Sequence, residues 1–461
     1  MSQPDLIAVR TPLTGAQKLL AVGLTLGVTL IAFDATSVVT ALPTITAELD
    51  GDSLYGVTLA SYTLANLLAL VAGGQIADRR GPRPTFLLSI AIFIVGLVVA
   101  ALAPAMWVVV VGRTLQGLGA GGLQPILYVL VKRAFPDDRQ PMIYVFLSSG
   151  WVLPSLIAPA FAGVITDVFG WRWVFAGLIP LAILVAVIAS SPMRAFGPSG
   201  DVGDDDTRRI LAAFVATSGV AIFVLGIRSP QAAIVAAAIV IGALLALPAL
   251  RRLLPAGVER AKRGQPAVLS VRLLATATFI GVDGFVPLAA DRIHGAKPMI
   301  QGFTIVGAAL TWTGGAALSA KRADLAPSIP VRWGFVLLVF GVAATAPVLW
   351  SSWPLWATFL GWSLGGFGMG LLFNPTTVSA MSYGDGSNDG LVSSQVQLVD
   401  ALGFSLMGGI GGALVAYADR NGGELRGPLL AAFGIALMCA VMGFAVSGRV
   451  ESAPSATTSP G

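Results

Sequence analysis

The sequence predicts an all-α polytopic membrane protein with fourteen membrane spans. Of its 461 residues, 56% are hydrophobic and only 11% are charged, and the mean hydropathy is +0.83. A soluble domain contains about 25% charged residues. Long apolar runs fill most of the chain, and each approaches the roughly 20 residues that a helix needs to cross a bilayer.

Short polar segments separate the apolar runs and divide them into groups. The expected spans are 17–42, 55–77, 84–104, 106–131, 141–164, 171–192, 209–227, 231–250, 269–290, 299–320, 331–350, 353–382, 391–418 and 427–447. Six spans fall within 17–192 and six within 269–448. The linker 193–268 holds two extra spans and a basic loop. Residues 1–16 form a short leading segment, and the Ser/Thr/Pro-rich tail 449–461 is expected to be disordered.

The distribution of basic residues predicts the orientation. An even number of spans places both termini on one side of the membrane. If that side is the cytoplasm, 21 of the 28 Lys and Arg residues lie in inside segments, as the positive-inside rule requires. The loop 251–268 is then expected to lie against anionic lipid. We therefore expect a multi-pass protein of the inner (cytoplasmic) membrane with both termini in the cytoplasm.

Several function classes are excluded. The single cysteine and single histidine allow neither an intrachain disulfide nor a Cys/His metal cluster. The phosphate-loop pattern G-x-x-x-x-G-K-[ST] is absent, so ATP is not expected to drive the protein. Because the basic residues lie in loops between spans, the pI near 9.6 does not indicate nucleic-acid binding. We expect no enzyme activity, no cofactor and a monomer whose partners are protons, membrane lipids and a small-molecule or lipid substrate.

Four ionisable residues stand out inside the expected spans, where charge is costly and therefore suggests function. Asp34 lies 8 residues before the end of its run, and Arg113 lies 7 residues into its own. At 1.5 Å per residue these positions correspond to depths of about 12 and about 10 Å from the same face. Asp283 is a second candidate for protonation or cation binding, unless its span is shorter and it lies at the rim. Asp400 shares a helix face with Gln397; the two either line a cavity or form a buried structural pair.

A faint internal repeat divides the chain into two halves. Residues 115–121, LQGLGAG, parallel residues 364–370, LGGFGMG, and Pro125 and Pro375 follow with a slip of one residue. Chance similarity between glycine-rich helices is the alternative. If the repeat is real, Asp283 lies in the first helix of the second half, as the counterpart of Asp34 in the first.

The turn between the runs 55–77 and 84–104 carries a distinctive pattern, GQIADRRGPR at residues 74–83. It resembles the loop between helices 2 and 3 of the major facilitator superfamily, G-x-x-x-D-R-x-G-R-[KR], although Pro82 stands where the family has arginine. The matching residues are Gly74, Asp78, Arg79, Gly81 and Arg83. A basic turn without a special role is the alternative.

Two further segments resemble the fourteen-helix drug:proton antiporters of that superfamily. Residues 34–43 match the first-helix pattern D-x-T-x-x-x-x-A-L-P, and residues 113–119 match the fourth-helix pattern R-x-x-q-G-x-G. In the fifth span, the exporter pattern G-x-x-x-G-P-x-x-G-G keeps Pro159 and Gly163 but has Ala158 and Ala162 in place of two glycines. That departure weakens the indication of drug export without affecting the likeness to the superfamily.

The resemblance covers about residues 15–448 and implies the major facilitator fold: two six-helix bundles plus two extra transmembrane helices between them. It implies multidrug efflux by alternating access, in which a proton gradient drives amphipathic or cationic molecules outward. Asp34 and Arg113 would interact at the central cavity, where protonation of Asp34 frees Arg113. A static ion pair is the alternative. Asp78, Arg79 and Arg83 would latch the cytoplasmic side.

Other polar or aromatic residues within the spans are expected to line the substrate cavity. They are Tyr62, Asn66, Gln124, Trp151, Asn374 and Gln397. For each of them a helix–helix hydrogen bond or simple packing is the alternative. Three other functions stay open: export of an endogenous lipid or metabolite, proton-coupled import, and a membrane scaffold or sensor that transports nothing.

Overall fold

The computed structural model describes residues 11–51, 54–198, 206–422 and 424–453, and within them the chain is helical with no β-strand. The α-helices are α1 (Gly15–Glu48), α2 (Tyr55–Arg80), α3 (Pro82–Ala101), α4 (Met106–Ala134), α5 (Gln140–Phe169), α6 (Arg172–Ala176), α7 (Leu178–Ser190), α8 (Asp206–Gly226), α9 (Ala232–Leu253), α10 (Gln265–Asp283), α11 (Val286–His294), α12 (Pro298–Lys321), α13 (Ser328–Thr345), α14 (Leu355–Met381), α15 (Asp389–Arg420) and α16 (Arg426–Ser447). Short 3-10 helices follow α7, α9 and α13, at Pro192–Ala195, Val258–Arg260 and Ala346–Leu349.

Twelve helical segments of the described chain are long and apolar enough to cross a membrane. An all-helical, multi-pass membrane protein is therefore confirmed. The two expected spans outside these twelve correspond to α4 and α5, which are 29 and 30 residues long. Helix α4 carries Arg113, Lys132 and Arg133, which lower its hydropathy. The count of fourteen stays a prediction.

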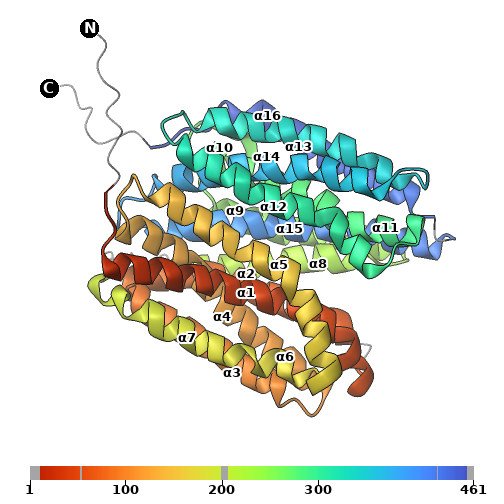
Figure 1. Ribbon diagram of the computed structural model, residues 1–461, viewed down its shortest axis with the longest axis horizontal. Coiled ribbons are helices and arrows are strands. Elements are labelled where there is room, and N and C mark those ends of the chain that lie inside the picture. Colours follow the sequence, from red (N-terminus) through yellow and green to blue (C-terminus); the bar gives the residue numbers. More distant parts are fainter. Residues whose placement is uncertain (1–10, 52–53, 199–205, 423, 454–461) are drawn as a thin grey trace, which may run out of the picture.

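Two helical bundles lie side by side, one built from α1–α7 and the other from α10–α16 (Figure 1). Helix α1 begins and helix α16 ends at the same end of the molecule, which we call the terminal end, and the opposite end is the far end. Helices α2 and α15 contact each other across the boundary between the bundles, as do α5 and α12. The interface between the two bundles is therefore formed in part by these four helices.

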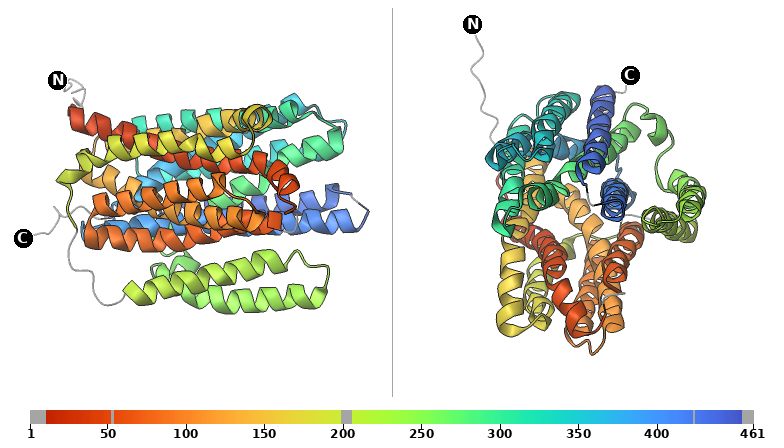
Figure 2. Two further views of the ribbon diagram at one scale, coloured as in Figure 1. Left: turned by 90° about the horizontal axis from the view of Figure 1, so that it is seen from below. Right: turned by 90° about the vertical axis from the view of Figure 1, so that its right-hand side faces the viewer.

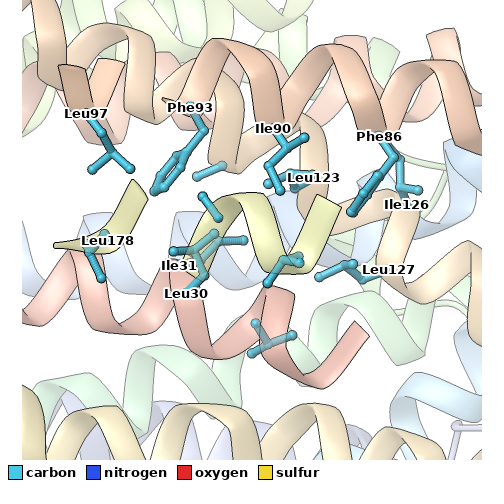
Figure 3. Packing of buried hydrophobic residues seen from close by; sticks show 14 of the residues in the cluster. Leu30, Ile31, Phe86, Ile90, Phe93, Leu97, Leu123, Ile126, Leu127 and Leu178 are labelled. Atoms are coloured by element: carbon cyan, nitrogen blue, oxygen red, sulfur yellow. The ribbon is translucent and has the colours of Figure 1, made fainter. Parts of the chain in front are cut away.

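Tight packing of apolar side chains holds the first bundle together. Leu30 and Ile31 of α1 belong to one apolar cluster with Phe93 of α3 and Leu127 of α4, and all four are at most 2% exposed (Figure 3). Helices α3 and α4 approach closely because Gly119 has no side chain: a Cβ atom there would lie 2.6 Å from Phe93. Small residues of this kind allow close helix packing in lipid.

The extra helices α8 and α9 form a hairpin on one flank of the molecule (Figure 2). Helix α8 packs against α2 of the first bundle and α15 of the second. Buried residues from the three helices, including Leu70, Ala213 and Leu402, form one apolar cluster. The hairpin therefore covers the boundary between α2 and α15.

Two expected spans are interrupted. The run 171–192 is divided into α6 and α7 at Gly177, and the run 269–290 is divided into α10 and α11 after Asp283. Pro287 has no N–H to donate to the carbonyl of Asp283, so a regular helix cannot continue through this point. Asp283 lies eleven residues before the end of the candidate span Gln265–His294.

The tail is partly fixed, contrary to the expected disorder of 449–461. Val450 is 1% exposed, and the carbonyl of Glu451 accepts hydrogen bonds from the hydroxyls of Ser379 (2.7 Å) and Tyr383 (2.9 Å). The sequence could not indicate this docking because it depends on the ends of α14 and α16 meeting. Residues 454–461 lie outside the described part of the chain.

Candidate functional site

Asp34 of α1 and Arg113 of α4 form a buried ion pair, the interaction that the resemblance to the antiporters implies. Nη1 of Arg113 donates to Oδ2 of Asp34 at 2.8 Å, and the two side chains are 3% and 0% exposed. An isolated buried charge would be very costly, so each group requires the other. The pair joins two helices of the first bundle.

Gln116 is a third member of this site that the sequence reasoning missed. Its Nε2 donates to Oδ1 of Asp34 at 3.0 Å, and its Oε1 accepts from Nη1 of Arg113 at 3.0 Å. Gln116 lies three residues after Arg113 and therefore on the same helix face, which was the available signal. The guanidinium of Arg113 also lies 4.0 Å from the ring centre of Tyr62, a cation–π contact. Nε of Arg113 is buried and has no hydrogen-bond partner among the described residues.

A second buried ion pair joins Arg272 of α10 to Asp400 of α15. Nε of Arg272 donates to Oδ1 of Asp400 at 3.1 Å, and Nη2 donates to Oδ2. Nη1 donates to the hydroxyl of Thr377 at 2.6 Å, and the guanidinium lies 3.8 Å from the ring centre of Phe373. The partner of Asp400 is therefore Arg272 and not Gln397, whose buried Nε2 has no partner among the described residues.

Asp283 belongs to a different environment. Its Oδ1 accepts a hydrogen bond of 2.8 Å from the indole N–H of Trp362 in α14. Trp362 is fully buried and stacks on Phe279, with 5.3 Å between the ring centres. The acid therefore lies beside aromatic rings in the second bundle.

At the terminal end, Asp78 of α2 caps the start of α15. Its carboxylate accepts the backbone N–H groups of Gly390 (2.9 Å) and Leu391 (3.0 Å), where the positive end of the helix dipole favours an anion. Gly74 makes this approach possible, since a Cβ atom there would lie 2.3 Å from the carbonyl oxygen of Gly390. Two residues of the predicted latch, Gly74 and Asp78, thus lie at the contact between the bundles.

Two cations at this contact, Lys132 and Arg133, were not among those predicted. Lys132 and Arg133, in the last turn of α4, bind Asp389 of α15 at 2.7 and 3.1 Å, and Arg133 also lies 3.4 Å from Asp78. Arg83 instead donates to the carbonyl of Ser190 inside the first bundle (3.2 Å), and the side chain of Arg79 is exposed. Gly81 has a φ of 89°, which a glycine accommodates, and Pro82 begins α3, where its missing N–H costs nothing.

The residues expected to line a cavity are placed differently from one another. Asn374 donates to the carbonyl of Pro141 at 3.2 Å and so makes a hydrogen bond between the bundles. Asn66 is buried, and its Nδ2 has no partner within the described chain. Gln124 is half-buried, and Trp151 is 45% exposed. Asn66 and Gln397 are thus the buried members with unused hydrogen-bond donors.

Comparison with known proteins agrees with this architecture. The sequence profile described as "Major Facilitator Superfamily" matches residues 24–323. A "Probable multidrug-efflux transporter" of Mycobacterium tuberculosis is 26% identical over 421 residues, which are 87% of each chain. "Multidrug resistance protein 3" of Bacillus subtilis is 29% identical over 167 residues, 36% of this chain and 33% of that protein.

A solved structure shares the fold. The human organic anion transporter MFSD10 superposes with a TM-score of 0.69 at 14% identity, over 94% of this chain and 100% of that one. The profile match spans more than half of the sequence, so the chain belongs to the major facilitator superfamily of membrane transporters.

Proposed function

We propose that this transporter is a proton-coupled exporter of amphipathic or cationic small molecules, in the fourteen-helix drug:proton antiporter branch. The observation that carries the proposal is the buried cluster of Asp34, Arg113 and Gln116. An intramembrane acid paired with a single guanidinium is a typical arrangement for proton transfer. The name of the M. tuberculosis relative supports efflux as the direction.

The cluster suggests how a proton exchanges for cargo. Protonation removes the charge of Asp34, so Arg113 loses its counter-ion while Gln116 can still bond the neutral carboxyl. A cationic molecule near the site has the opposite effect, because Coulomb attraction favours the ionised carboxylate. Proton and cation thus favour different states of one group, and each can displace the other from the same carrier.

The contacts at the terminal end support alternating access. Three contacts hold the two bundles together there: Asp78 accepts from the start of α15, Lys132 pairs with Asp389, and Asn374 donates to the carbonyl of Pro141. We take the terminal end as cytoplasmic because of the positive-inside pattern. The conformation is then closed toward the cytoplasm. In this proposal α4 and α5 complete fourteen spans in the inner membrane.

The decisive change is Asp34→Asn, which keeps the shape of the side chain and removes its charge and its exchangeable proton. We expect efflux of ethidium from proteoliposomes, driven by an imposed pH gradient, to fall to the level of protein-free vesicles. Asp324→Asn, an exposed acid in the loop after α12, is the matched control and should leave the rate unchanged. Gradient-driven efflux by Asp34→Asn at the normal rate would contradict the proposal.

A further inference from the structure

The two bundles place an acid at equivalent positions but give it different partners. The glycine-rich segments 115–121 and 364–370 are 249 residues apart, and the same offset relates Asp34 to Asp283 and Arg113 to Trp362. In each bundle the two side chains are hydrogen bonded at 2.8 Å across 79 residues of sequence. Tryptophan therefore replaces arginine, and the contacts of the described chain give Asp283 no cationic partner.

The backbone at Asp283 also favours a positive charge. Asp283 is the last residue of α10, and α11 does not begin until Val286. The end of a helix that exposes carbonyl groups is the negative end of its dipole. In transporters, interrupted helices that end this way inside the membrane can hold cations. The carboxylate and the negative end of the helix dipole thus both attract a positive charge.

Three aromatic rings form a cluster beside this position. Phe279, one turn before Asp283, stacks on Trp362 and meets the edge of Trp312 at 5.2 Å between ring centres. Trp312 also packs against the apolar cluster that Val145 of α5 forms with Ala316 and Ala320 of α12, so the aromatic cluster reaches the boundary between the bundles. The indole nitrogen of Trp312 is buried and has no hydrogen-bond partner within the described residues. Ring faces attract cations, and most strongly those that are weakly hydrated.

We propose that Asp283, Phe279, Trp312 and Trp362 form the subsite that recognises the positively charged group of an organic cation; this rests on the proposed cationic cargo. A metal ion is a poor fit, because the described residues contain no group of three or more acidic, His or Cys side chains that could hold one. One carboxylate beside aromatic rings suits a quaternary ammonium or phosphonium group. The first bundle then handles the proton, and the second handles the cargo.

The test is equilibrium binding of tetraphenylphosphonium to the purified full-length protein in detergent, measured by calorimetry without a pH gradient. Asp283→Asn should raise the dissociation constant about 30-fold, because it removes a charge from a desolvated site. Asp291→Asn, an exposed acid in α11 that accepts from Gln301, is the control and should stay within about twofold. Neutral triphenylphosphine oxide should bind the wild type and Asp283→Asn equally.

Unchanged affinity of a folded Asp283→Asn for tetraphenylphosphonium would overturn the subsite, as would a wild type that does not bind it. If Asp283→Asn does not fold, binding of tetraphenylphosphonium by Trp312→Leu tests the subsite instead. We expect its affinity to fall about three- to tenfold. Asp34→Asn should still bind tetraphenylphosphonium, with a smaller loss of affinity than Asp283→Asn, because it removes only the Coulomb attraction of a more distant charge. Binding that depends on Asp283 in a protein without gradient-driven export would uphold the subsite and contradict the proposed function. Gradient-driven export by the wild type, together with an unchanged tetraphenylphosphonium affinity of Asp283→Asn, would uphold the proposed function and contradict the subsite.

Discussion

Gly74→Ala is expected to disfavour closure at the terminal end and to slow transport. The added methyl group would lie 2.3 Å from the backbone oxygen of Gly390, and a backbone atom cannot rotate away. Overpacking of this kind costs about 1–3 kcal/mol. If the cost falls only on the closed state, the population of that state drops by about 5- to 150-fold relative to the open one.

Chemical labelling measures this shift. In a Cys439→Ser background, Ser393→Cys introduces a thiol at a fully buried position of α15 whose native hydroxyl binds the Pro125 carbonyl. A membrane-impermeant thiol reagent should modify it faster when Gly74→Ala is present. Gly163→Ala is the control, since no atom lies within 4 Å of its added Cβ. Equal labelling rates in the Gly74→Ala and Gly163→Ala proteins would show that the glycine contact does not limit closure.

Arg272→Ala is expected to destabilise the protein by about 3–5 kcal/mol, the cost of leaving a buried charge without its partner. Arg272 is fully buried, and the change would leave Asp400 and the hydroxyl of Thr377 without their shared donor. Thermal or denaturant unfolding of the purified protein should show the loss.

A paired substitution separates the charge from the packing. Arg272→Met combined with Asp400→Leu removes both charges, and we expect it to recover most of the lost stability. Arg322→Ala, at an exposed arginine after α12, should change stability by less than about 0.5 kcal/mol. An Arg272→Ala protein as stable as the Arg322→Ala protein would refute the structural importance of the pair.

Local pattern and the resemblance to the antiporters together predicted the first ion pair. Asp34 and Arg113 are isolated charges in long apolar runs, and helix rise alone gave them matching depths. Gln116 was within reach of the same reasoning because it lies one turn from Arg113. The importance of Trp362 could also have been predicted, because the offset of the glycine repeat, extended to the neighbouring residues, makes Trp362 equivalent to Arg113.

Other parts of the site depend on contacts between distant segments. Arg272 was not singled out, although it lies near the start of the expected span 269–290; α10 begins at Gln265 and places Arg272 two turns inside. Lys132 and Arg133 find Asp389 more than 250 residues away, a pairing set by how α4 and α15 meet. No local pattern carries that information; the predicted latch cations Arg79 and Arg83 came from the resemblance to the superfamily loop.

The central claim, that Asp34 exchanges a proton for cargo, is tested most directly by cargo-driven proton movement. Proteoliposomes with an enclosed pH dye and a clamped membrane potential receive an inward ethidium gradient with no initial pH difference. The account predicts that the lumen becomes alkaline with the wild type and stays constant with Asp34→Asn, although the variant still binds ethidium. Proton movement by Asp34→Asn at the wild-type rate would contradict the account. So would a wild type that transports ethidium without moving protons.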